Sequence, residues 1–172
     1  MEVGLGNIIS NVLIAVLGAI FTGKAFRFIH EGELGIKLRF GKALRNSDGT
    51  PRIIRPGFVL IIPFVETLQR RNVRQQTLAL SDQTVMITDN LIFTVSAMVM
   101  FRVIDIYRAL FEIDELDQSL KDLSMAILRE VLAKKTHDGL TDMEAMSKEL
   151  LDALKPKGHE WGVEFLQFRL TD

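Results

Sequence analysis

The run LIFTVSAMVMFRV, from Leu91 to Val103, alternates between an apolar and a mixed set of side chains. Period-two alternation over this length is typical of a β-strand with one buried face. The mixed set carries a single charge, at Arg102, so we expect helices to cover part of that face as well. The face expected in the core is apolar throughout and consists of Leu91, Phe93, Val95, Ala97, Val99, Phe101 and Val103.

Two more strands are expected before this run. Asp89-Asn90 is a turn-forming pair, so the segment that begins at Val85 is predicted to form a hairpin with the run. A second alternation, over residues 34–41, predicts a half-buried strand. Its inward face is expected to carry Leu34, Ile36, Leu38 and Phe40.

Helical spacing of apolar residues begins after Asp105. A first helix is predicted from Leu116, Leu120, Leu123, Ile127 and Val131, with a stop at His137-Asp138-Gly139. A second helix is predicted to start at the capping box Thr141–Glu144 and to end at Pro156 and Gly158. The apolar stripe expected on this second helix is Met143, Met146, Leu150 and Leu154.

The segment from Trp161 to Leu170 returns to alternation and predicts a last strand. We expect Val163, Phe165 and Gln167 to share one face, opposite Glu164, Leu166, Phe168 and Leu170. The order of strands, two helices and a strand indicates an α+β fold with a mixed, mainly antiparallel sheet and two packed helices.

The N-terminal segment from Val3 to Phe21 contains no charged residue and has about the length that spans a bilayer as a helix. A cleaved signal peptide and a buried core helix are the alternatives. The first lacks a basic start and a cleavage site, and the second would need a polar face. We therefore predict an anchor over residues 1–24, spanning or half-inserted, before a domain at 25–172. Its apolar residues are Ile8, Ile9, Val12, Leu13, Ile14, Val16, Leu17, Ile20 and Phe21.

Basic residues follow the anchor and none precedes it, which places the domain on the cytoplasmic side by the positive-inside rule. Lys24 and Arg27 of this flank are candidate contacts for lipid headgroups. Arg70, Arg71 and Arg74 form a second cluster, which suits headgroups, an acidic partner or simply a solvated strand face.

A short apolar run lies between Pro56 and Val65 and is too short to span a membrane. It is either a buried strand or a second membrane contact beside the anchor. The residues concerned are Phe58, Val59, Leu60, Ile61, Ile62 and Phe64.

Composition argues against several functions. The 21 basic and 22 acidic residues give a net charge of −1, which disfavours nucleic-acid binding, and the absence of cysteine excludes disulfides and Cys-based zinc sites. His30, His137 and His159 lack the spacing of metal ligands, and no phosphate loop or nucleophile elbow is present. The acidic residues between Glu112 and Asp117 fit a helix N-terminus better than a calcium loop. We expect no catalytic residue, cofactor or metal.

Ordered landmarks over residues 25–172 resemble the stomatin, prohibitin and flotillin family, also called the band 7 or SPFH domain. They are Glu31-Gly32-Glu33-x-Gly35, Arg39-Phe40-Gly41-Lys42, Pro56-Gly57-Phe58, Ile62-Pro63-Phe64, Val73-Arg74-Gln75-Gln76-Thr77-Leu78, Thr88-Asp89-Asn90, Phe101-Arg102-Val103-Ile104-Asp105, Leu128-Arg129-Glu130-Val131 and Trp161-Gly162-Val163-Glu164. Family members usually continue into a long charged assembly helix, and no heptad run follows Leu170 here.

The resemblance implies a non-enzymatic, membrane-anchored scaffold that organises membrane proteins or lipid microdomains, through homo-oligomerisation. The alternative it implies is a membrane-tethered regulatory partner of a membrane protease. A membrane-bound enzyme is the least supported class. The expected partners are membrane lipids, further copies of the chain and a membrane-associated protease, with no nucleic acid.

Overall fold

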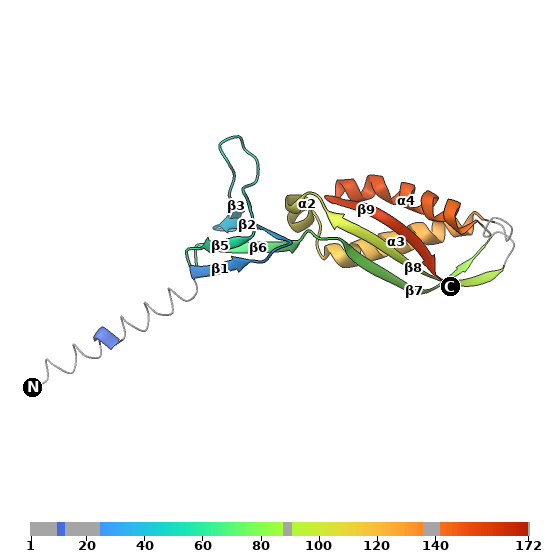
Figure 1. The fold of residues 1–172 in the computed structure, drawn as a ribbon, viewed down its shortest axis with the longest axis horizontal. Coiled ribbons are helices and arrows are strands. Elements are labelled where there is room, and N and C mark those ends of the chain that lie inside the picture. The colour runs from blue at the N-terminus through green and yellow to red at the C-terminus, as the bar shows by residue number, and fades with distance from the viewer. Residues whose placement is uncertain (1–9, 13–24, 88–90, 136–141, 172) are drawn as a thin grey trace, which may run out of the picture. The chain divides into compact units, whose positions relative to one another are not determined.

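The computed structural model describes residues 10–12, 25–87, 91–135 and 142–171. The chain divides into two compact units, Met1–Arg71 and Asn72–Asp172 (Figure 1). The fold class is α+β, with antiparallel sheets and two main helices, as the sequence predicts. The strands form three small sheets rather than the single mixed sheet that was expected.

The predicted anchor falls almost wholly outside the described residues. Val12 lies in a described helical fragment, residues 10–12, and is 57% exposed. In the described ranges, no helix combines the length and the apolar character needed to cross a bilayer. Outside these ranges lie Ile8, Ile9, Leu13, Ile14, Val16, Leu17, Ile20, Phe21 and the flanking Lys24.

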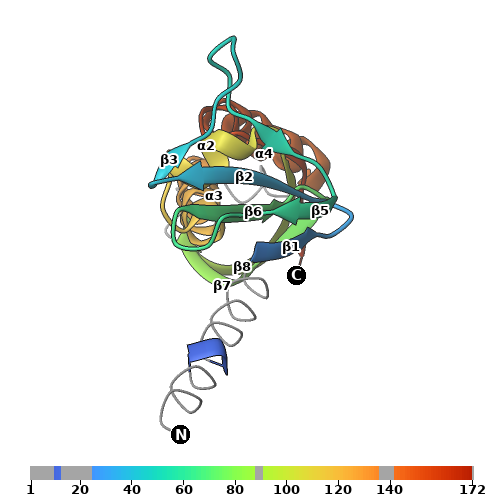
Figure 2. The ribbon, with the colours of Figure 1, turned by 90° about the vertical axis from the view of Figure 1, so that its left-hand side faces the viewer.

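The first unit is built from short strands. β1 (Phe26–Ile29) pairs antiparallel with β5 (Gly57–Leu60) to form a two-stranded ribbon. β2 (Glu33–Arg39) pairs antiparallel with β3 (Lys42–Ala43) and β4 (Ile53–Ile54), and it also pairs with β6 (Glu66–Asn72). The connection from β3 to β4 projects from these strands (Figure 2).

A small core holds the first unit together. Ile29, Val59 and Ile61 are buried against one another, and Ile36 is fully buried on β2. Gly35 is needed here, because a Cβ at this position would lie 2.7 Å from Cδ1 of Ile29. The prediction that Phe40 faces inward is wrong. β2 ends at Arg39, and Phe40 turns outward with a φ of 49° and 77% of its surface exposed.

The second unit is a three-stranded antiparallel sheet covered by helices (Figure 1). Its strands are β7 (Gln76–Met86), β8 (Ile92–Val103) and β9 (Val163–Thr171), in the order β7-β8-β9. Its helices are α2 (Ile106–Phe111), α3 (Leu116–Ala133) and α4 (Met143–Glu160). The antiparallel pairing of β7 with β8 confirms the predicted hairpin, although the turn residues 88–90 lie outside the described ranges.

The faces of β8 were predicted correctly on one side and incorrectly on the other. Ala97, Val99, Phe101 and Val103 are buried in the main core, whereas Leu91, the residue before the strand, is 46% exposed. The opposite face is open, with Ile92 65% and Met98 38% exposed. The expected helical cover is therefore wrong, because α3 and α4 both pack on the apolar face.

A β-bulge changes the faces of β9. Phe101 pairs with Phe165 but Met100 pairs with Gln167, so Leu166 is the extra residue. Beyond the bulge Phe168 is buried in the core and Gln167 stands opposite Met100 on the other face. The prediction that Phe168 opposes Phe165 is wrong because it assumed uninterrupted alternation.

The ends of the helices also differ from the predictions. Of the apolar stripe predicted for α3, Leu116, Leu120 and Val131 are buried, whereas Leu123 and Ile127 are only half-buried. The N-cap of α4 is Asp142, whose side chain accepts from the Ala145 N–H, while Thr141 lies outside the described ranges. α4 continues through Pro156 and Gly158, so the predicted stop there is wrong. Gly158 serves close packing, since a Cβ there would lie 2.7 Å from the Phe165 ring.

Candidate membrane-contact surface

The β1–β5 ribbon exposes apolar side chains on one face. The register places Phe26 opposite Leu60 and Phe28 opposite Phe58. Because side chains alternate along a strand, these four share one face, while the neighbouring Ile29 and Val59 point into the core. We call Phe26, Phe28, Phe58 and Leu60 the aromatic ribbon face; they are 47%, 61%, 57% and 58% exposed.

The three rings of this face contact one another. The centroid of Phe58 lies 5.3 Å from that of Phe26 and 5.4 Å from that of Phe28, the second pair in an edge-on arrangement. Such distances are favourable for aromatic pairs. The surface is therefore a clustered apolar patch rather than scattered single residues, and clustering of this kind marks contact surfaces.

The turn that follows β5 extends the apolar surface. Ile61 and Pro63 are buried, whereas Ile62 is 47% exposed and Phe64 is 89% exposed. Phe64 also has a φ of 68°, a left-handed conformation that side chains with a Cβ rarely adopt. The predicted run of residues 58–64 thus divides by alternation. Its odd-numbered members are buried in the core and its even-numbered members face outward.

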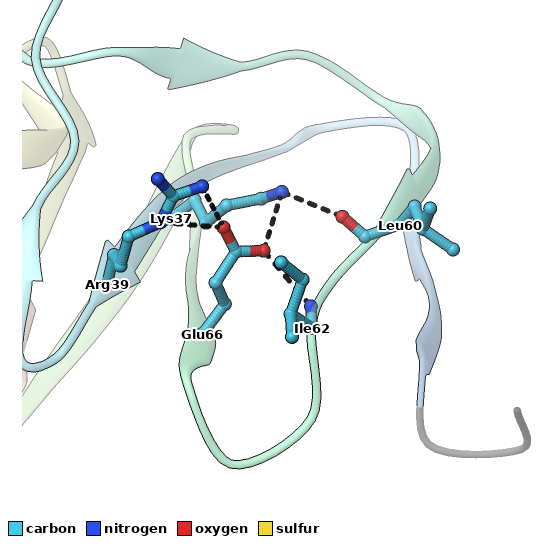
Figure 3. A network of polar contacts seen from close by, with 5 residues as sticks. All are labelled: Lys37, Arg39, Leu60, Ile62 and Glu66. Atoms are coloured by element: carbon cyan, nitrogen blue, oxygen red, sulfur yellow. Dashed lines mark hydrogen bonds and ion pairs between the residues drawn. The ribbon is translucent and has the colours of Figure 1, made fainter. Parts of the chain in front are cut away.

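A buried carboxylate holds this turn in place (Figure 3). Glu66, at the start of β6, is only 5% exposed, and its Oε1 accepts from Nη2 of Arg39 at 2.8 Å and from Nε at 3.2 Å. Oε2 accepts from the backbone N–H of Ile62 at 3.0 Å and lies 3.1 Å from Nζ of Lys37. Lys37 also donates to the carbonyl oxygen of Leu60 at 2.7 Å. The network ties both ends of the turn to β2.

These donors keep Glu66 ionised. The pKa of Glu66 is lowered from 4.5 to about 2, with hydrogen bonding from Arg39 as the largest cause and burial acting in the opposite direction. The hydrogen bond from the Ile62 N–H and the nearby ammonium of Lys37 act in the same direction. The Glu66 carboxylate that holds the turn is therefore fully charged at neutral pH.

A cleft of about 720 Å³ lies beside the exposed apolar residues and contains two of the predicted headgroup contacts. Arg27 and Arg70 both line it, together with Phe26, Phe28 and Phe64. Arg70 donates to the carbonyl oxygen of Phe28 at 3.1 Å and lies 3.5 Å from Oε2 of Glu33. Arg27 is exposed.

Two further candidates for headgroup contact, Arg71 and Arg74, are not among the residues that line this cleft. Arg71 follows Arg70 on β6, is half-buried and does not line the cleft. Arg74 belongs to the second unit, where its backbone N–H donates to Oδ1 of Asn72. Of the described candidates in the first unit, only Arg27 and Arg70 line the cleft.

Charge is distributed unevenly between the two units. Residues 25–71 contain nine Lys and Arg against four Asp and Glu, a net charge of +5, whereas residues 72–172 contain eleven against seventeen, a net charge of −6. The whole-chain charge of −1 conceals this asymmetry. The unit that exposes the apolar surface is thus the basic one, a combination that suits an anionic bilayer surface.

Sequence reasoning missed several residues of this surface. Phe26 and Phe28 alternate with Arg27 and Ile29 directly after the predicted anchor, a short signal for an amphipathic strand that could have found them. The role of Glu66 left no such signal, because its partner Arg39 lies 27 positions away. Within the described ranges, no group of three or more acidic or histidine side chains is arranged to hold a metal ion.

Comparison with known proteins gives the family. The sequence profile of the SPFH domain / Band 7 family matches residues 27–172. The chain belongs to this family, and the landmark resemblance is confirmed.

Individual relatives are distant or match in part. A protein from Methanothermobacter thermautotrophicus is 23% identical over 163 residues, covering 94% of this chain and 49% of that protein. The putative band 7 family protein R614 of Acanthamoeba polyphaga mimivirus is 27% identical over 148 residues, 86% of this chain and 46% of its own. The modulator of FtsH protease HflC from Escherichia coli is 42% identical over 71 residues, 41% of this chain and 20% of its own. The chain thus spans about half the length, or less, of these relatives.

Proposed function

We propose that this chain is a non-enzymatic, membrane-anchored scaffold whose first unit rests on the bilayer surface. The segment from Val3 to Phe21 is the retained anchor, and the aromatic ribbon face with Ile62 and Phe64 enters the interface beside it. The exposed aromatic ribbon face is the observation that carries the proposal, since four large apolar side chains share one face and are each about half exposed or more.

The energetics favour contact with lipid over water. Fully burying a large apolar side chain is worth roughly 1.5–3 kcal/mol, so each half-exposed residue of the face would contribute about 1 kcal/mol on insertion. Each basic residue close to anionic lipid adds about 1 kcal/mol more. Sequence continuity supports the same arrangement, because β1 begins five residues after Phe21, the last residue of the uncharged segment.

The proposal is tested with single cysteines, which label uniquely because the chain has none of its own. An environment-sensitive fluorophore is placed at Phe64→Cys and, as the control, at Ala153→Cys, an exposed position on α4 of the second unit. In the full chain reconstituted in anionic vesicles, we expect a blue-shifted emission and quenching by spin-labelled lipids at position 64 only. An emission spectrum typical of water at position 64 would contradict the proposed contact of the first unit with the bilayer.

Scaffolding requires assembly, for which the second unit offers strand edges. β7 and β9 are the outer strands of its sheet, and neither pairs with a further strand among the described residues. An uncovered edge presents backbone donors and acceptors that suit pairing with another copy. We expect the full chain in mild detergent to be a large homo-oligomer by light scattering. A monomer at all accessible concentrations would contradict the scaffold.

A regulatory partner of a membrane protease is the second candidate. Its specific support is the 71-residue match to the modulator of FtsH protease HflC, which is closer in identity than the longer matches. This candidate predicts that a membrane protease co-purifies with the full chain in a fixed ratio. Isolation of the oligomer free of any protease would favour the scaffold alone. In both cases we place the domain on the cytoplasmic side.

A further inference from the structure

A second, smaller groove of the first unit carries a concentration of positive charge. It has a volume of about 350 Å³ and lies between the β2–β4 strands and β5. Three cationic side chains line it, and no carboxylate is among its lining residues in the described part of the chain. The lining residues are Lys37, Leu44, Arg52, Ile53, Ile54, Arg55, Phe58, Val59 and Leu60.

The three cations differ in how far their charges are compensated. Lys37 is paired with Glu66 at 3.1 Å and donates to the Leu60 carbonyl oxygen, so its ammonium is already engaged. Arg52 and Arg55 are exposed and form no ion pair with a carboxylate in the part of the chain that the structure describes. Each guanidinium therefore offers its full set of planar N–H donors, a geometry that suits a phosphate group.

The groove is continuous with the apolar surface described above. Phe58 and Leu60 line the groove and also belong to the aromatic ribbon face. Ile53, a further lining residue, is 50% exposed. A ligand that fits both parts needs an anionic group for the arginines and an adjoining apolar part for Phe58 and Leu60. Phospholipids combine these two features.

We propose that this groove binds the phosphate of an anionic phospholipid, with Arg52 and Arg55 donating to the phosphate oxygens. Phe58 and Leu60 lie against the glycerol and the upper acyl chains. This inference rests on the proposed contact of the first unit with the bilayer and adds to it a defined headgroup site. Arg52 and Arg55 lie outside the cleft that contains Arg27 and Arg70.

The test compares two double variants with equal loss of charge. Arg52→Gln/Arg55→Gln removes the two uncompensated groove charges. Lys42→Gln/Arg45→Gln removes two charges from the same β3–β4 region that do not line the groove. Binding of phosphatidylglycerol and of zwitterionic phosphatidylcholine to the detergent-solubilised full chain is measured by native mass spectrometry.

We expect Arg52→Gln/Arg55→Gln to lower the affinity for phosphatidylglycerol about tenfold or more, the equivalent of about 1.4 kcal/mol. We expect Lys42→Gln/Arg45→Gln to leave it nearly unchanged, and phosphatidylcholine to bind weakly to all forms. Equal losses in both double variants, or no loss in either, would overturn the headgroup site. Displacement of the lipid by inorganic phosphate alone would also overturn it, in favour of a site for free phosphate.

The fluorophore at Phe64→Cys separates failure of this inference from failure of the proposed function. If the probe at position 64 contacts lipid but Arg52→Gln/Arg55→Gln leaves the affinity for phosphatidylglycerol unchanged, the proposed membrane contact stands. Only the headgroup site in the groove is then contradicted. An emission spectrum typical of water at position 64, in the chain that keeps Arg52 and Arg55, would contradict the membrane contact itself.

Discussion

Arg39 on β2 donates two hydrogen bonds to Glu66 on β6, from Nε at 3.2 Å and from Nη2 at 2.8 Å, and both reach the same carboxylate oxygen. The other oxygen of Glu66 accepts from the Ile62 N–H. A pair 27 positions apart therefore fixes the turn that exposes Ile62 and Phe64. The polar network therefore supports a turn with exposed apolar side chains, and the stability of that turn reports whether the network is intact.

Glu66→Gln should loosen this turn. The substitution keeps the size of the side chain but removes the charge and one acceptor, and a hydrogen bond to a charged group contributes about 2 kcal/mol. We expect hydrogen exchange at the Ile62 amide to accelerate by about 30-fold. Glu112→Gln, at an exposed position of the second unit, is the control and should change nothing at Ile62. Unchanged exchange in Glu66→Gln would show that the charged carboxylate is not needed to hold the turn.

The same carboxylate predicts a pH dependence. The pKa of Glu66 falls from 4.5 to about 2 on folding, so the unfolded state takes up the proton first as the pH drops. Its contribution to stability is complete above about pH 4.5 and is lost as the pH falls towards about 2. Protection of the Ile62 amide should therefore decline over this range, and Glu66→Gln should remove that decline. A decline of equal size in Glu66→Gln would assign it to other groups.

Substitution by lysine should have very different effects on stability at two adjacent residues of β8. Val99 is fully buried, so Val99→Lys places an ammonium in the core and should cost several kcal/mol. Met98 lies on the open face at 38% exposure, where the stem of a lysine can lie along the sheet and its charge reach water, so Met98→Lys should cost less than about 0.5 kcal/mol. Urea unfolding followed by Trp161, the only tryptophan, measures both. Similar stabilities would mean that the faces are wrongly assigned.

Gly158→Ala should destabilise the second unit although alanine favours helices. The new Cβ would lie 2.7 Å from the buried Phe165 ring and 3.1 Å from the Val163 carbonyl oxygen. Overpacking of this kind costs about 1–3 kcal/mol, more than the gain of about 1 kcal/mol in helix propensity. A double-mutant cycle with Phe165→Leu checks the cause. The penalty of Gly158→Ala should shrink in the Phe165→Leu background, and strict additivity would exclude the ring as its origin.

Local patterns were enough to predict much of the second unit. The apolar face of β8, the hairpin with β7 and part of the stripe of α3 are encoded in residue periodicity, which depends only on neighbours a few positions apart. Predictions failed where a contact between distant residues overrode the local rule. The bulge at Leu166 brings Phe168 into the core, and α4 continues past its expected stop to Glu160, with Gly158 close to the Phe165 ring.

The candidate surface was predictable in part for the same reason. The run from Phe58 to Phe64 was recognised as apolar, but which members face outward depends on the pairing of β1 with β5. The groove lined by Arg52 and Arg55 could not be predicted from the sequence, because its lining residues come from segments spread over residues 37–60.

By itself, the sequence determined the α+β class, the family and the order of the main strands and helices of the second unit, because periodicity and ordered landmarks are local properties of the chain. Only the tertiary structure decided which apolar residues remain exposed. Exposure depends on which strand covers which face, and that requires contacts between residues far apart in the chain, such as Phe28 with Phe58 and Arg39 with Glu66.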